Sequence, residues 1–140
     1  MADDGAGIAV LELIMGMGMP KGVDVVDAGT GGIALLHILA NRDAVVIADA
    51  VDMGLRPGIV RIFSPDDVVS VKELKRLSLH EGDVFETIVL ARRLDQCPAK
   101  IIICAIQPKS IAPKIGLTAP VRKGLPEFAR AIGNAVKSKR

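Results

Sequence analysis

Residues 44–49, Ala-Val-Val-Ile-Ala-Asp, restrict the fold of this chain more than any other segment, because an uninterrupted apolar run ends in a carboxylate. A strand without polar alternation has both faces covered, as in the middle of a parallel sheet packed between helices. In open α/β sheets, ligands bind outside the carboxyl ends of the strands. The sequence therefore predicts that Asp49 lies beside a crevice and makes it the leading candidate for a functional residue.

The length and composition predict a single domain, residues 1–140, with a core built from aliphatic side chains. Half of the 140 residues are apolar, but there are three Phe and no Trp or Tyr. A chain of this size buries roughly two thirds of its unfolded surface. The net charge of +2 does not indicate a nucleic-acid partner. The basic residues that gather at positions 137, 139 and 140 are typical of a solvated tail.

The two cysteines, Cys97 and Cys104, indicate neither a disulfide framework nor a metal site, because their spacing fits neither. Cys104 lies within an apolar run and is predicted to be a small core residue. No run approaches the eighteen or more apolar residues typical of a membrane span, and the acidic start is unlike a signal peptide. These features predict a cytoplasmic protein without a membrane partner.

Apolar runs of strand length alternate with segments of helical period, which predicts an α/β fold with right-handed crossovers and a mostly parallel, twisted sheet between helices. The predicted strands are 23–27, 44–49, 59–63 and 101–107. The predicted helices are 5–17, 31–41, 83–95 and 120–137. In the first two helices, the inward residues are predicted to be Ile8, Leu11, Ile14 and Met15, then Leu35, Leu36, Ile38 and Leu39.

Polar residues follow three of the predicted strands at the points where the strands end. These residues are Asp27, Asp49 and Gln107, and Asp4 at the start of the first helix would join the same edge. If the strands are parallel neighbours, their ends converge at roughly 5 Å per strand spacing. Two carboxylates and the imidazole of His80 could then bind a divalent transition metal.

Three of these residues also have a purely structural interpretation. Asp27 is compatible with a carboxylate that stabilises a turn, Asp4 with a helix N-cap, and His80 with a surface histidine. His37, inside an apolar helix, is better explained as a packed core residue than as a ligand. The glycine-rich loop 29–32 matches neither a dinucleotide fingerprint nor a P-loop, so nucleotide binding is not predicted.

Short segments along the whole chain together resemble one family. They are Asp3-Asp4-Gly5-Ala6-Gly7, Asp27-Ala28-Gly29-Thr30-Gly31-Gly32, Ile47-Ala48-Asp49-Ala50, Pro57-Gly58-Ile59-Val60, His80-Glu81, Ile106-Gln107-Pro108 and Gly116-Leu117-Thr118-Ala119-Pro120-Val121. Taken in this order, they resemble the hydrogenase maturation endopeptidases, which trim the large subunit of nickel–iron hydrogenases. A resemblance to the branch that serves coenzyme F420-reducing hydrogenases is weaker.

The resemblance implies a cytoplasmic peptidase with a helix–sheet–helix fold. Such an enzyme removes a C-terminal extension from the large-subunit precursor after nickel insertion. It further implies that Asp4, Asp49 and His80 contact nickel, which the substrate bears, and that no organic cofactor is needed. Asp27 and Asp49 are the implied catalytic residues, and the implied substrate-binding residues are Gly29, Thr30, Gly31 and Gln107.

The family's first strand and its Gly-x-Gly-Asn turn would precede Asp3 and are not found in this sequence. The expectation is either a sheet without the usual first strand or a strand encoded upstream of Met1. Two other functions therefore stay open: a non-catalytic domain that binds the large subunit, and a hydrolase with its own resident metal. A monomer is expected, or a dimer if another chain completes the sheet.

Overall fold

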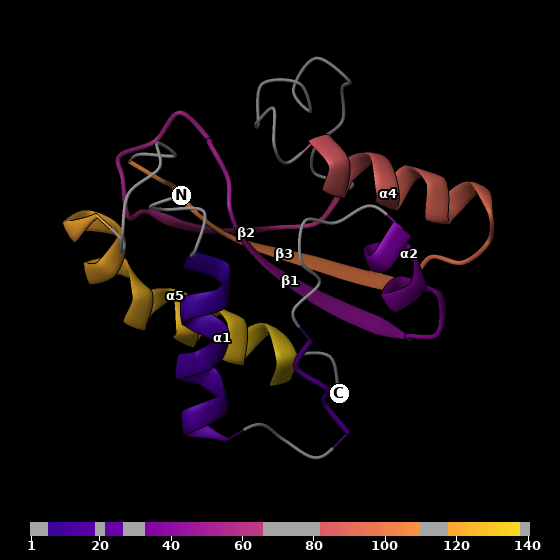
Figure 1. Ribbon diagram of the computed structural model, residues 1–140, viewed down its shortest axis with the longest axis horizontal. Coiled ribbons are helices and arrows are strands. Elements are labelled where there is room, and N and C mark those ends of the chain that lie inside the picture. Colours follow the sequence, from indigo (N-terminus) through magenta and orange to yellow (C-terminus); the bar gives the residue numbers. More distant parts are fainter. Residues whose placement is uncertain (1–5, 19–21, 27–32, 66–81, 110–117, 138–140) are drawn as a thin grey trace.

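The computed structural model describes residues 6–18, 22–26, 33–65, 82–109 and 118–137, which form helices packed on both faces of a small sheet (Figure 1). In chain order, the elements are α1 (Ala6–Met17), α2 (Ile33–Ala40), β1 (Ala44–Ala50), β2 (Val60–Phe63), α4 (Gly82–Arg93), β3 (Lys100–Ile106) and α5 (Ala119–Lys137). The predicted α/β class is confirmed. None of the helices in the described part of the chain is long and apolar enough to cross a membrane.

The three described strands form a mixed sheet in the order β1-β3-β2. β1 runs parallel to β3, with Asp49 opposite Ala105, whereas β2 runs antiparallel to β3. The prediction that both faces of β1 are covered is confirmed, because its side chains enter the apolar clusters on both sides of the sheet. Among the described strands, β3 has two neighbours and β1 has one. An uninterrupted apolar run indicates that both faces of a strand are covered. This can be true of a strand at the edge of a sheet as well as of a central one.

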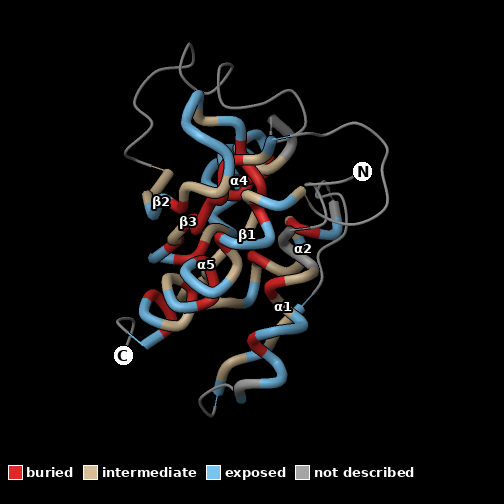
Figure 2. Tube along the Cα trace, turned by 90° about the vertical axis from the view of Figure 1, so that its left-hand side faces the viewer, coloured by how far each residue is buried: buried red, intermediate tan, exposed pale blue. Residues whose placement is uncertain are grey.

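Two apolar clusters cover the two faces of the sheet. One cluster joins α1 and α5 to the sheet through residues such as Val10, Phe128 and Ile106, and the other packs α2 and α4 on the opposite face. Successive side chains of β1 alternate between these clusters, with Val46 on the α1/α5 side and Val45 on the α2/α4 side. Figure 2 shows the buried residues along the sheet and the inward faces of the helices.

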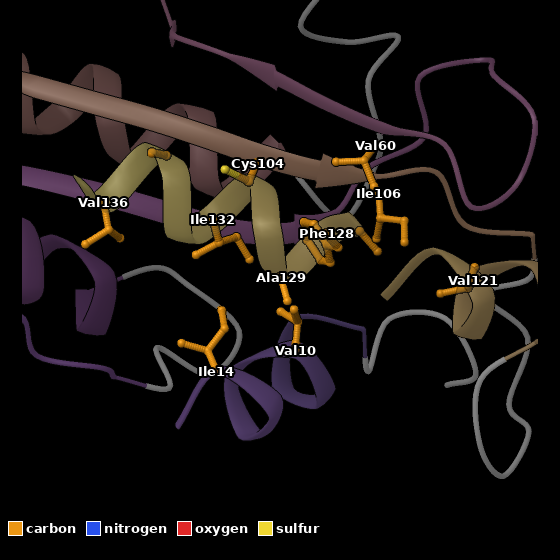
Figure 3. Packing of buried hydrophobic residues seen from close by; sticks show 12 residues of the cluster. Val10, Ile14, Val60, Cys104, Ile106, Val121, Phe128, Ala129, Ile132 and Val136 are labelled. Carbon is orange, nitrogen blue, oxygen red and sulfur yellow. The ribbon is translucent and has the colours of Figure 1, made fainter. Parts of the chain in front are cut away.

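The contact between α1 and α5 is a narrow aliphatic seam. Val10 and Ile14 of α1 lie against Ala129 and Ile132 of α5 (Figure 3). Met15, predicted to face inward, is 63% exposed, because the buried stripe of α1 is one i, i+4 row. In α2, the inward positions of Leu35 and Leu39 are confirmed, with Leu36 and Ile38 half-buried. His37 is exposed, which corrects its predicted place in the core.

Two predicted boundaries also change. Residues 23–26 of the predicted strand 23–27 belong to no strand, although Val23 packs on the α1/α5 cluster. Apolar character there reflects packing, whereas a strand requires a hydrogen-bonded neighbour. Helix α4 ends at Arg93 instead of continuing to residue 95, because Asp95 adopts a left-handed conformation with φ of 56° and the amide of Gln96 donates to Ala91 O at 2.8 Å.

Burial of Cys104 predicts a loss of stability at alkaline pH. Its thiol is fully buried, and desolvation raises its pKa from 9.0 to about 11. Below pH 9 the thiol is protonated in both the folded and the unfolded chain, so its contribution is fully present there. Between pH 9 and pH 11 only the unfolded chain ionises, which favours unfolding by roughly 2–3 kcal/mol in total.

The measurement compares wild type with Cys104→Ala by denaturant unfolding at pH 8 and pH 11. Groups shared by both proteins cancel, so the stability advantage of the wild type should shrink over this range. A constant difference between the two proteins would contradict the burial of an un-ionised thiol.

Candidate functional site

Asp49 lies at the carboxyl end of β1, where the sequence predicts it, as the next-to-last residue of the strand. Its side chain is half-buried, and Oδ1 accepts a hydrogen bond from the amide of Ala50 at 2.9 Å. By the alternation of the strand, Asp49 shares the face of Val45 and Ile47, which is the face covered by α2 and α4. A carboxylate in this place can accept a proton or ligate a metal ion.

Helix α4 approaches the same end of the sheet with its first turn. Figure 1 shows that α4 runs in the direction opposite to β3, so that the first turn of α4 lies toward the end of the sheet at which β1 and β3 finish.

Gln107 follows β3 at this edge and is buried, with 5% of its surface exposed. Its carboxamide oxygen Oε1 accepts hydrogen bonds from the amides of Met53 at 2.6 Å and Leu55 at 3.2 Å. Its nitrogen Nε2 donates to Asp52 Oδ1 at 3.1 Å and to Pro108 O at 3.2 Å. The side chain thus joins the end of β3 to the loop that follows β1.

These four bonds use the full hydrogen-bonding capacity of the carboxamide. An amide oxygen has two lone pairs and an amide nitrogen two hydrogens, and each is matched here. The partners also fix which atom is oxygen, because two N–H groups must face an acceptor and two oxygens must face a donor. Gln107 was predicted to bind substrate. That role stays a prediction; among the described residues, the four bonds of its side chain go to the loop after β1 and to Pro108 O.

The loop, residues 51–59, is also fixed by its backbone. The amide of Val51 donates to Ile106 O at 3.1 Å, and the amide of Gly58 donates to Gln107 O at 2.8 Å. In return, the amide of Gln107 donates to Ile59 O at 2.8 Å. We call residues 51–59 the β1–β2 loop; both its ends are therefore tied to the chain around Gln107.

A tight turn closes the β1–β2 loop against α5. Pro57 and Gly58 occupy the centre of a turn in which the amide of Ile59 donates to Arg56 O at 3.2 Å, and Gly58 has φ of 88°. Proline followed by a glycine with positive φ is typical of a type II turn. A Cβ at Gly58 would overlap Pro120 O, and one at Gly124 would lie 2.5 Å from Gly58 O. Both glycines are needed for this close approach.

The other predicted site residues lie outside the described part of the chain: Asp4, Asp27, Gly29, Thr30, Gly31 and His80. The predicted metal-contacting trio of Asp4, Asp49 and His80 and the catalytic role of Asp27 therefore stay predictions. Among the residues that the structure describes, no group of three or more His, Cys, Asp or Glu side chains could hold a metal ion. Asp49 and Gln107 are the predicted residues that the structure brings to one edge.

The sequence-based reasoning missed the role of Asp52 and the contact between the β1–β2 loop and α5. One signal was available, since the dipeptide Pro57-Gly58 indicates a type II turn. The pairing of Gln107 with amides more than 50 residues earlier in the chain has no comparable local signal.

Comparison with known protein families gives one match over most of the chain. Residues 8–135 match the family model of the hydrogenase maturation proteases. A hydrogenase expression/formation protein, HupD, of Bradyrhizobium diazoefficiens is 35% identical over 123 residues, which is 86% of this chain and 64% of that protein. The hydrogenase 2 maturation protease of Escherichia coli is 31% identical over 86% of this chain and 74% of its own length.

Solved structures agree with this match. The hydrogenase maturating endopeptidase HybD from Escherichia coli superimposes with a TM-score of 0.86 at 26% identity, over 99% of this chain and 86% of that one. The nickel–iron hydrogenase maturation protease HybD from Thermococcus kodakarensis gives a TM-score of 0.73, also at 26% identity, over 97% of this chain and 91% of that one. The chain spans a little under two thirds of the length of the Bradyrhizobium relative.

Proposed function

This chain belongs to the hydrogenase maturation protease family, and from that premise we propose that it is an endopeptidase of the cytoplasm. Its substrate is the precursor of the large subunit of a nickel–iron hydrogenase, from which it removes a C-terminal extension after nickel has been inserted. The single observation that carries the proposal is the half-buried carboxylate of Asp49 at the carboxyl end of β1, beside a loop whose amides are hydrogen-bonded to Gln107.

The chemistry of this edge suits recognition of a metal that arrives with the substrate. Asp49 offers carboxylate oxygens at a strand end, and in the proposal Asp4 and His80 contribute the remaining carboxylate and imidazole. Nickel bound to the precursor then reports that insertion is complete, and Asp27 and Asp49 act on the scissile peptide. Gly29, Thr30 and Gly31 are proposed to contact the extension.

The proposed function is tested by measuring the mass of a nickel-loaded precursor before and after incubation with the chain. Loss of a C-terminal peptide from the nickel-loaded precursor, and not from nickel-free precursor, supports the proposal. Binding without trimming would instead identify a non-catalytic binding domain. If peptidase treated with a chelator and then desalted no longer cuts nickel-loaded precursor, a resident metal is required and the substrate-borne assignment is wrong.

Asp49→Asn is expected to slow cleavage by about 100-fold or more, the usual loss when a group that acts in the transition state is removed. The amide keeps the size of the side chain and an oxygen that can accept from Ala50, so the fold should persist. The matched control is Asp43→Asn, an exposed aspartate just before the other end of β1, which should cleave at the wild-type rate. Equal rates for Asp49→Asn and wild type would remove Asp49 from the site.

A further inference from the structure

The middle of the β1–β2 loop is exposed to solvent, while two of its backbone amides donate hydrogen bonds to the buried side chain of Gln107. Gly54, Leu55, Arg56 and Pro57 are exposed, and Leu55 is a large apolar residue with 37% of its surface accessible. Beneath them, the amides of Met53 and Leu55 point to the Gln107 oxygen. An apolar and a cationic side chain are thus displayed on a loop whose backbone amides at Met53 and Leu55 are hydrogen-bonded to Gln107.

The position of this loop relates it to Asp49. The loop begins two residues after Asp49, and its first residue, Val51, is 2% exposed and bonded to Ile106 O. Asp49 itself is fixed by the β1–β3 register opposite Ala105. Two supports therefore act separately: the strand ladder holds Asp49, and the Gln107 carboxamide holds residues 52–55.

From this arrangement we propose that Gln107 is a positioning residue, which preforms the β1–β2 loop as the wall against which the precursor docks beside Asp49. The proposal rests on the proposed peptidase function and specifies which surface binds the substrate. A preformed loop binds more tightly because it loses less conformational entropy on docking. Arg56 and Leu55 are the side chains that this wall offers to the precursor.

The hydrogen bond between Gln107 and Asp52 allows a substitution that tests whether Gln107 holds the loop. In Gln107→Glu the new side chain keeps an oxygen for Met53 and Leu55, but it places a second oxygen where Nε2 donates to Asp52. Two carboxylates then face each other without a proton between them, and the loop should loosen. Adding Asp52→Asn removes the repulsion between the two carboxylates. It leaves the new carboxylate oxygen facing Pro108 O, and the amide that faces this carboxylate no longer accepts from Gly54, so the double variant should recover only part of the lost order.

The experiment combines amide hydrogen exchange with precursor binding on the full chain. In Gln107→Glu, exchange should accelerate about tenfold or more at Met53 and Leu55 and stay unchanged at Val51 and Gly58, whose amides bond to backbone carbonyls. The Kd for nickel-loaded precursor should rise about tenfold. This is the effect expected when the hydrogen bond from Gln107 to the Asp52 carboxylate is lost and binding must order the loop again. KM should rise in parallel with little change in kcat, because the ladder still holds Asp49.

The matched control is Gln96→Glu, the same change of charge at an exposed residue after α4, beside the opposite end of β3. It should leave exchange in the loop and precursor binding as in wild type. An unchanged Kd in Gln107→Glu despite faster exchange would show that the β1–β2 loop does not bind the precursor. Unchanged exchange would show that Gln107 does not position the loop. If Gln107→Glu does not fold, the folded double variant is measured in the same way: faster exchange at Met53 and Leu55 must come with a weaker Kd, and a wild-type Kd would overturn the proposal.

Failure of the peptidase function is distinguishable from failure of this proposal. A wild-type chain that binds precursor without cutting it would contradict the peptidase, while the Kd comparison would still decide the role of Gln107. A wild-type chain that does not bind precursor would overturn both.

Discussion

Gly58→Ala is expected to lower the free energy of unfolding by about 2–5 kcal/mol. Two costs add up: a left-handed conformation costs a residue with a Cβ about 1–2 kcal/mol, and an inserted atom in a tight contact typically costs 1–3 kcal/mol. Gly58 has φ of 88°, and an added Cβ would overlap Pro120 O and lie 3.0 Å from the carbonyl carbon of Pro120. Both neighbours are backbone atoms of α5, which cannot turn aside.

The chain contains a control that separates the two costs. Gly54, in the same loop, has φ of 70° but has nothing within 4 Å of an added Cβ. Gly54→Ala should therefore cost about 1–2 kcal/mol, from the backbone alone. Urea or guanidinium unfolding of both variants gives the difference, and equal losses would mean that the loop does not press on α5.

The contact between the β1–β2 loop and α5 can also be tested by a substitution in α5. A Cβ at Gly124 would lie 2.5 Å from Gly58 O and 3.0 Å from Ile106 Cδ1, whereas nothing lies within 4 Å of one at Gly133 in the same helix. Gly124→Ala should thus destabilise the protein. Gly133→Ala should stabilise it by roughly 0.5–1 kcal/mol, the difference in helix propensity between the two residues.

Phe128→Ala is expected to cost about 3–5 kcal/mol, the usual range for truncating a buried aromatic side chain. Phe128 has no exposed surface and lies in the α1/α5 cluster beneath the sheet, near Ala129 and Val10 (Figure 3). Small domains have about 5–15 kcal/mol of stability in total, so the variant should melt far below the wild type.

The control for this substitution is Arg130→Ala, two residues along the same helix and exposed. Alanine and arginine have similar helix propensities, so its effect should stay within about 0.5 kcal/mol. Phe128→Leu should fall between the two. A loss below 1 kcal/mol for Phe128→Ala would contradict its place in the core, because removing a buried ring leaves a cavity that destabilises the fold by more than this.

The helices and strands could largely be predicted, because their apolar periodicity is a local property. The predicted helix 120–137 matches α5 within one residue, and the predicted strand 44–49 differs from β1 by one residue. The prediction for residues 23–27 failed over 23–26, since apolar residues can pack on a core without entering a ladder. Met15 and His37 were misplaced for a related reason: periodicity shows that a helix has an inner face without fixing how wide that face is.

In the candidate site too, one residue could be found from the local sequence pattern and the role of another could not. Asp49 could be found from sequence because it ends an apolar run, and a strand delivers its last residues to the edge of the sheet. The role of Gln107 could not be found in this way. Its partners Met53 and Leu55 are 54 and 52 residues away along the chain, and sequence spacing carries no information on such pairs.

The sequence by itself thus determined the α/β class, two covered faces for β1, a carboxylate at its end and the membership of a family. The tertiary structure decided that β3 lies between the other two described strands, that β2 joins it antiparallel, and that Gln107 holds the loop after β1. The physical reason is the range of the forces involved. The presence of a buried face follows from the pattern of close neighbours along the chain, whereas the width of that face, the strand order and the buried hydrogen-bond partners follow from contacts that only the folded chain brings together.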